Sequence, residues 1–213
     1  MVLANGRKAG QSTGIGNESG HDQMKPTALY HYYEHSQGPF RNLSDLPMKE
    51  AQEVQRQLKE AGKGFASKRS DDYMSIRREL EDKARRMFIA KGGTPLRSRP
   101  HYLTLGETPW LQEWYRDARK IELPIEDFNP QIISFTYGDL FPTMRYGDDK
   151  PYRKQVFTLH EIFSIIDEFG LPQEWNRDGL HGPERYIEAQ VWDDEPLLPY
   201  IHKLNEKSGK EIK

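Results

Sequence analysis

The residues best suited to chemistry lie in one short segment near the end of the chain. Polar and aromatic residues alternate there with small apolar ones, in the order Tyr186, Ile187, Glu188, Ala189, Gln190, Val191 and Trp192. This alternation predicts a strand with one buried face, so Glu188 and Gln190 share the other face about 7 Å apart. A carboxylate beside an amide, flanked by aromatic rings, is typical of a cleft wall. The alternative is that Glu188 faces solvent on an antiparallel strand.

His31 is a second residue with chemical potential, because a histidine can donate or accept a hydrogen bond near neutral pH. It lies between Tyr30 and Tyr32 in a short tyrosine-rich run, 28–33, that predicts a strand. Strand alternation puts His31 and Tyr33 on one face, and Tyr30 and Tyr32 on the other. The alternative is a packed histidine whose ring is satisfied by its neighbours.

Two further predicted strands carry polar and aromatic residues. In the segment 101–105, Tyr102 and Thr104 share one face, and Tyr102 can stack on a planar ligand. The segment 131–137 ends in Tyr137, followed by a Gly-Asp turn where a side chain can be directed toward a cleft. Asp139 of that turn can equally bond its own backbone.

Several reaction classes find no support. The chain has no cysteine, which excludes a thiol nucleophile, a cysteine zinc site and a disulfide scaffold. It also has no Gly-x-Ser-x-Gly elbow of a serine hydrolase. His31 and His35 have the spacing of a metal pair only on a helix, and their context is strand-like, so we expect no metal site. Asp139 and Glu188 would suit the two carboxylates of glycoside chemistry, but the sequence does not fix their separation.

The elements that must position these residues follow from periodicity. Apolar residues recur at helical spacing over 48–61, 73–88 and 159–169, and Thr158 with Glu161 makes a capping box. The predicted order is strand, two helices, three strands, helix, strand. The predicted class is therefore α+β, with small mixed or antiparallel sheets and a helical insertion between the first two strands.

One domain fits the 213 residues. Residues 1–27 are rich in Gly, Ser and Asn and predict a flexible tail, and 205–213 predict a second tail. The single domain then spans 28–204, with the helical insertion at about 45–91. The net charge of −2 argues against binding to nucleic acid through phosphate contacts alone. No apolar run reaches the roughly 20 residues of a membrane span, so we expect a cytoplasmic protein with no membrane partner.

Three of these segments, taken in order, resemble the ADP-ribosyltransferase fold in its His-Tyr-Glu branch. Members of that branch have an aromatic-flanked His on the first core strand, a Tyr on a second strand and a Glu on a late strand. The matching segments here are Tyr30-His31-Tyr32, His101-Tyr102-Leu-Thr, and Tyr186-Ile-Glu188 with Pro196-Leu after it. The predicted helices of residues 45–91 fall where the family often has helical insertions.

This resemblance implies an enzyme that binds NAD+ as its nucleotide substrate and transfers or hydrolyses ADP-ribose. It implies that His31 bonds the nicotinamide ribose or the adenosine side, Tyr102 stacks on nicotinamide, and Glu188 holds the ribose hydroxyl and stabilises positive charge as nicotinamide leaves. Thr104, Tyr137 and Gln190 are then further NAD-binding candidates. Arginine-modifying members have Gln or Glu two residues before the catalytic Glu, where this chain has Tyr186. The spacing from His31 to Tyr102 is also long, so the acceptor stays open.

A non-enzymatic interaction module is the competing hypothesis. The second helix carries arginines off its apolar stripe, and Trp110, Trp114 and Tyr115 follow later in the chain. Basic and aromatic residues together can bind a protein or nucleic acid. The alternative for the arginine-rich face is a solvated helix surface.

Overall fold

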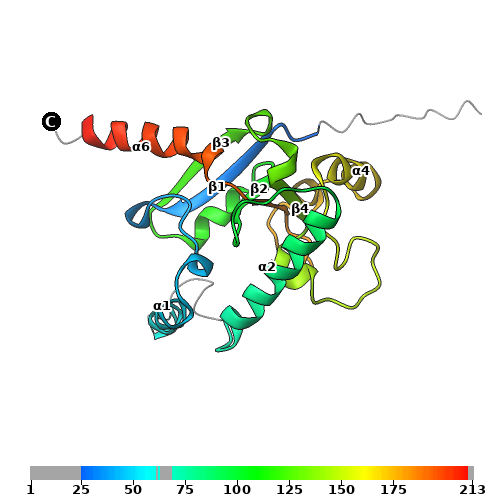
Figure 1. Ribbon diagram of the computed structural model, residues 1–213, viewed down its shortest axis with the longest axis horizontal. Helices are drawn as coiled ribbons and strands as arrows, with labels where there is room; N and C mark the ends of the chain where they lie inside the picture. The colour runs from blue at the N-terminus through cyan, green and yellow to red at the C-terminus, as the bar shows by residue number, and fades with distance from the viewer. Residues whose placement is uncertain (1–24, 61, 63–68, 211–213) are drawn as a thin grey trace, which may run out of the picture.

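A single five-stranded antiparallel sheet forms the centre of the part of the chain that the structure describes, in the order β3-β1-β2-β5-β4 (Figure 1). The computed structural model describes residues 25–60, 62 and 69–210. The strands are β1 (Ala28–Glu34), β2 (His101–Leu105), β3 (Ala118–Pro124), β4 (Ile133–Tyr137) and β5 (Ile187–Val191). The predicted α+β class is confirmed, with one antiparallel sheet rather than several small ones. Residues 1–24 of the predicted tail lie outside the described residues.

The helices follow the predicted order with additions. They are α1 (Met48–Glu60), α2 (Tyr73–Ala90), α3 (Leu140–Thr143), α4 (Leu159–Phe169), α5 (Pro172–Trp175) and α6 (Leu198–Lys210). Helices α1 and α2 form the predicted insertion between β1 and β2. The predicted capping box at the start of α4 is present, with Thr158 and Glu161 bonded to each other's backbone N–H.

The C-terminal segment differs from the prediction of a tail beginning at residue 205. Helix α6 continues to Lys210, and 211–213 lie outside the described residues. Its first half is anchored because Tyr200, Ile201 and Leu204 pack against the main hydrophobic core. That anchorage explains why the polar residues after position 204 continue a helix that has already begun.

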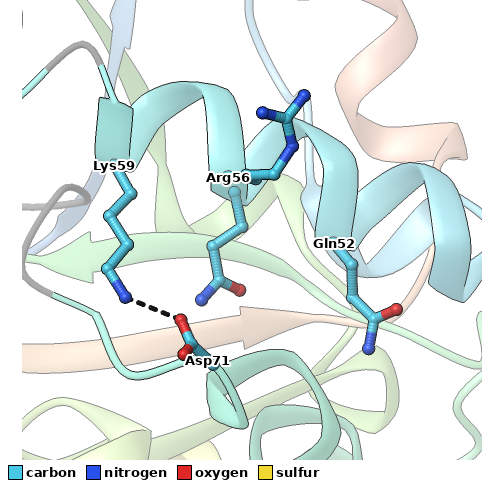
Figure 2. Close-up of a pocket in the computed structure, with 5 residues that line it drawn as sticks. Gln52, Arg56, Lys59 and Asp71 are labelled. Carbon is cyan, nitrogen blue, oxygen red and sulfur yellow. Dashed lines mark hydrogen bonds and ion pairs between the residues drawn. The ribbon is translucent and has the colours of Figure 1, made fainter.

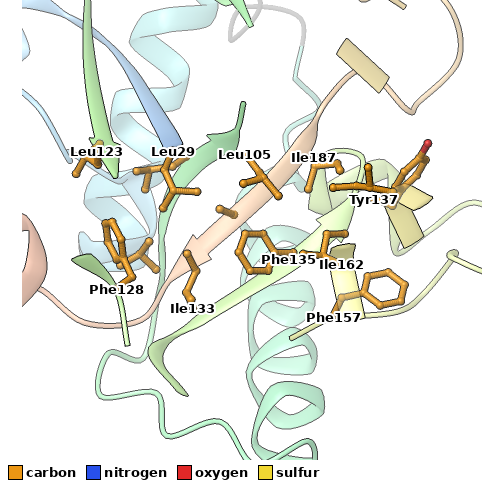
Figure 3. Close-up of a cluster of buried hydrophobic side chains, with 14 of the residues drawn as sticks. Leu29, Leu105, Leu123, Phe128, Ile133, Phe135, Tyr137, Phe157, Ile162 and Ile187 are labelled. Carbon is orange, nitrogen blue, oxygen red and sulfur yellow. The ribbon is translucent and has the colours of Figure 1, made fainter. Parts of the chain in front are cut away.

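One face of the sheet is apolar and carries the main core. Leu29, Leu105, Ile133, Phe135 and Ile187 line this face. Helix α4 covers it, and Ile162 of that helix lies among these residues, as Figure 3 shows. We call this side of the sheet the core face.

The other side of the sheet, which we call the polar face, is covered by α2 and α3. Ala84 and Phe88 of α2 and Leu140 of α3 cluster there with Trp192. The strand register assigns the polar-face residues, since directly paired residues of neighbouring strands project to the same side. One row across four strands is Tyr30, Thr104, Glu188 and Thr136, and the next holds Tyr102, Gln190 and Ser134.

Candidate functional site

The polar face brings four of the six predicted site residues together on the two central strands. Glu188 and Gln190 lie on β5, and their register partners on β2 are Thr104 and Tyr102. On the other side of β5, Thr136 and Ser134 of β4 pair with the same two residues. Glu188 therefore lies in the interior of the sheet, bordered on both sides by threonines.

Glu188 is buried, which corrects the alternative of a solvent-facing residue. Only 7% of it is exposed. Its Oε1 accepts hydrogen bonds from the Leu140 backbone N–H at 3.2 Å and from Gln190 Nε2 at 3.1 Å. Burial raises the pKa of the Glu188 carboxyl well above its usual range, and the negative charge of Asp139 raises it further. The hydrogen bonds and Arg77 oppose this shift without reversing it.

Gln190 has a positioning role rather than a ligand contact in this arrangement. It is completely buried, and its Oε1 accepts from Ser134 Oγ at 3.0 Å. Its Nε2 lies 3.0 Å from Thr136 Oγ1 as well as within reach of Glu188. The amide of Gln190 therefore orients the Glu188 carboxyl from the next position on the same face of β5.

Tyr102 lies on the predicted face but is already engaged. Its hydroxyl donates to Glu81 Oε1 at 2.7 Å, and the Arg77 guanidinium lies 4.7 Å from its ring centroid. Burial and the charge of Glu81 raise the pKa of the Tyr102 hydroxyl. The expected stacking of nicotinamide on Tyr102 thus meets a ring that Arg77 covers on one side. Thr104 is buried and bonds the Gly106 carbonyl at 2.8 Å.

Glu81 of α2 is a functional candidate that the sequence did not single out. It is fully buried, and its Oε1 accepts from Ser44 Oγ at 2.8 Å and Arg77 Nε at 2.9 Å, besides Tyr102. Arg99 lies 3.6 Å from its other oxygen. Two arginines compensate this buried carboxylate, so it ties α2 to the polar face. From the sequence alone, Glu81 is only one acidic residue within a predicted helix, because its partners Ser44, Arg99 and Tyr102 lie outside that helix.

His31 lies on the core face, opposite Glu188, which corrects the expectation that the two share one cleft. Its neighbour Tyr30 pairs with Thr104 in the Glu188 row, so alternation turns His31 away. Its Nδ1 lies 3.1 Å from the Tyr102 carbonyl, and its Nε2 accepts from the Phe40 N–H at 2.9 Å. Burial lowers the pKa of His31 to about 4. The structure therefore supports the alternative interpretation, a packed histidine whose two ring nitrogens both have hydrogen-bond partners.

Tyr137 is also on the core face. Its register partner is Ile187, and Figure 3 shows it among the buried apolar residues. The hydroxyl donates to the carbonyls of Phe169 and Gly170 at the end of α4, at 3.0 and 2.8 Å. Tyr137 therefore fastens α4 to the sheet and does not reach the polar face.

A group of mostly aromatic side chains, some buried and some half-buried, adjoins Glu188 on the polar face. We call it the aromatic cluster, and it consists of Tyr30, Tyr32, Trp110, Leu111, Trp114, Tyr115 and Tyr186. Tyr186 lies two residues before Glu188 and places its ring 5.9 Å from that of Trp110. Tyr30 lies in the same row as Glu188, two strands away, at about 10 Å. Strand alternation separates Tyr30 from His31, and the register between strands assigns Tyr30 to the face of Glu188.

Three of the four arginines of α2 make internal contacts, which weakens the hypothesis of a basic binding face, whereas Arg86 is exposed. Arg78 donates to the carbonyls of Ser44 and Leu46, and Arg85 donates to the carbonyls of Pro95 and Arg97. Arg77 is bound to Glu81. These side chains hold the loops on either side of the helix rather than a solvated surface.

Two cavities lie away from the predicted site residues. One, of about 310 Å³, lies between α1 and the start of α2, where Lys59 and Asp71 form an ion pair at 2.6 Å (Figure 2). The other, of about 240 Å³, is lined by residues of the loop after α3, including Tyr146 and Lys150. Among the described residues, no group of three His, Asp or Glu side chains is arranged to hold a metal ion.

Comparison with known proteins gave no match to a protein family, to a curated protein or to a solved structure. None of the helices within the described ranges has both the length and the apolar character needed to cross a bilayer. The function of the chain must therefore be inferred from the polar face itself.

Proposed function

We propose that the chain is an NAD+-dependent, ADP-ribosyltransferase-like enzyme. It cleaves the bond between nicotinamide and ribose and passes ADP-ribose to water or to another acceptor. The observation that carries this proposal is the placement of Glu188, a buried carboxyl at the centre of a polar sheet face beside Tyr102, Thr104 and Gln190. Buried carboxyls with strongly shifted pKa values are concentrated at functional sites.

The chemistry of NAD+ suits a buried carboxylate. The nicotinamide ring carries a positive charge that moves onto the ribose as the glycosidic bond breaks. A carboxylate in a site of low dielectric stabilises such a charge far better than one in water. In the protein without ligand, the pKa of Glu188 is raised. A bound cation attracts the carboxylate and therefore favours its ionised form. At a pH below the raised pKa of Glu188, NAD+ binding should therefore release a proton from this carboxyl.

Tyr30, rather than Tyr102, is the ring that we propose for stacking on the ligand. It shares the row of Glu188, is half-buried, and belongs to the aromatic cluster. The Nζ atom of Lys120 lies 5.4 Å from the centroid of the Tyr30 ring. Lys120 belongs to β3, the strand at the edge of the sheet. A separation of about 10 Å is close to the length of nicotinamide riboside.

Calorimetric titration with NAD+ in two buffers of different ionisation enthalpy tests this proposal. Wild type should bind with proton release, and Glu188→Gln should bind without it. Tyr30→Ala should weaken binding by about 2- to 12-fold, the effect of one lost aromatic contact. Leu198→Ala, which shortens an exposed side chain of α6, should leave affinity unchanged. Absence of heat at millimolar NAD+ would contradict the proposal.

A further inference from the structure

Asp139 lies next to Glu188 and has no part in the function proposed so far. It precedes α3 and follows the left-handed Gly138, whose φ of +106° brings the chain sharply out of β4. A Cβ on Gly138 would lie 2.6 Å from Thr143 Oγ1. The turn therefore requires glycine, and it fixes where Asp139 enters the site.

The first turn of α3 holds both carboxyl groups. Asp139 Oδ1 accepts from the Phe141 N–H at 2.8 Å, and its Oδ2 accepts from the Tyr186 hydroxyl at 3.2 Å. The next residue, Leu140, donates its N–H to Glu188. Tyr186 immediately precedes β5 and lies on the same face as Glu188, so Asp139 is fixed to this face by the Tyr186 hydroxyl and by the first turn of α3.

The two carboxyls differ in access to solvent. Asp139 is half-buried, whereas Glu188 is nearly covered. The charged and titratable groups that interact with this pair are Arg77 of α2, Tyr102 of β2 and Tyr186 before β5. Glu81 in turn interacts with Tyr102, and Arg185 with Tyr186. Pairs of carboxyls in environments of unequal polarity commonly divide acid and base roles between them.

Resting on the proposed function, we propose that Asp139 is the general base of the site and takes the proton of the acceptor. The bond between C1′ of the ribose and N1 of nicotinamide breaks, and its electron pair neutralises the ring. The acceptor oxygen then forms a bond to C1′, and its proton passes to the Asp139 carboxylate. Asp139 is the more exposed of the two carboxyls, so this proposal puts the acceptor beside Asp139 and the ribose beside Glu188.

Asp139→Asn separates this role from capping, because an asparagine caps a helix as well as an aspartate does. Its Oδ1 can still accept from the Phe141 N–H, and its Nδ2 can donate to the Tyr186 hydroxyl oxygen. Hydrolysis of NAD+ by this variant should be slower by about 100-fold or more, the usual range for a lost general base. Its affinity for NAD+ should change little. Azide, an anionic nucleophile that has no proton to lose, should restore nicotinamide release and yield ADP-ribosyl azide.

Asp193→Asn is the matched control. Asp193 also accepts a backbone N–H two residues ahead, that of Glu195 at 3.1 Å, but it follows the far end of β5. Its rate should equal that of wild type. A wild-type rate in Asp139→Asn, or a slow variant that azide does not rescue, would overturn the role of Asp139 alone. A wild-type protein that releases no nicotinamide would overturn both this role and the proposed function.

Discussion

Replacing Glu188 with Gln should stabilise the folded protein at neutral pH, and the gain should grow with pH. Gln has the shape of the protonated carboxyl, and its oxygen can accept the same two hydrogen bonds from Leu140 and Gln190. In the folded state burial and Asp139 raise the pKa of Glu188 above its usual 4.5, so the folded protein binds the proton more tightly than the unfolded chain. Ionisation of Glu188 therefore favours unfolding as pH rises.

The magnitude follows from linkage. Above about pH 4.5, the wild type should lose stability relative to Glu188→Gln by up to about 1.4 kcal/mol per pH unit. The loss ends where the pH passes the folded-state pKa. For a chain of this size, one pH unit in that window corresponds to a difference of about 3–6 °C in Tm. At pH 4 and below the two proteins should be nearly equally stable.

Urea unfolding of both proteins from pH 4 to pH 8 measures this difference. Glu122→Gln, which removes an exposed carboxylate on β3, controls for the loss of one negative charge. It should follow wild type within about 0.5 kcal/mol. A difference between wild type and Glu188→Gln that does not vary with pH would refute the account of Glu188 as a buried carboxyl with a raised pKa.

Three further predictions concern residues around the site. As the pH falls from 6.5 to 4, His31 should lower the free energy of unfolding of wild type by up to about 3 kcal/mol. In this range the unfolded chain binds a proton at His31, whereas the folded protein, in which the pKa of His31 is about 4, does not. Urea unfolding of His31→Gln should lose this slope, and parallel curves would argue against it. Arg85→Ser should lower the unfolding free energy by about 1–3 kcal/mol through two lost carbonyl contacts, while Arg86→Ser, on the exposed side of α2, should change it by less than about 0.5. Equal effects of the two serines would contradict the internal role of Arg85. Gly138→Ala should lower the Tm, since a side chain there meets both a left-handed backbone and Thr143; an unchanged Tm would mean that the turn relaxes.

The order of elements could be predicted because it depends on local patterns. The capping box at Thr158, the helical stripe of α2 and the alternation of β5 each lie within one segment. The shared face of Glu188 and Gln190 is equally local, since strand alternation fixes it. These features need no knowledge of which strands are neighbours.

The side of the sheet on which His31 lies could not be predicted, because it depends on register between strands. Alternation separated His31 from Tyr30, but only the pairing of Tyr30 with Thr104 shows which of them shares the Glu188 face. Tyr137 was misplaced for the same reason. The interpretation of the α2 arginines as a solvated or binding face also missed their long-range contacts, because the carbonyls that Arg78 and Arg85 bind belong to segments outside the helix.

The short helices escaped prediction for a different reason. Helix α3 has four residues, too few to display a periodic stripe, although the sequence does predict a turn at its cap, Asp139. The second half of α6 is polar, and its composition predicts a tail. Its helical state follows from residues before it that pack against the core, a tertiary effect that composition does not report.

The release of nicotinamide from NAD+ by wild type and by Glu188→Gln, measured at saturating NAD+, tests the central claim most directly. A carboxylate that stabilises the developing positive charge acts mainly in the transition state, so its loss lowers kcat even when NAD+ saturates the site. We predict a decrease of about 100-fold or more in Glu188→Gln, and no decrease in Glu122→Gln. Equal rates in wild type and Glu188→Gln, or no release by either, would contradict the assignment of Glu188 as the catalytic carboxylate.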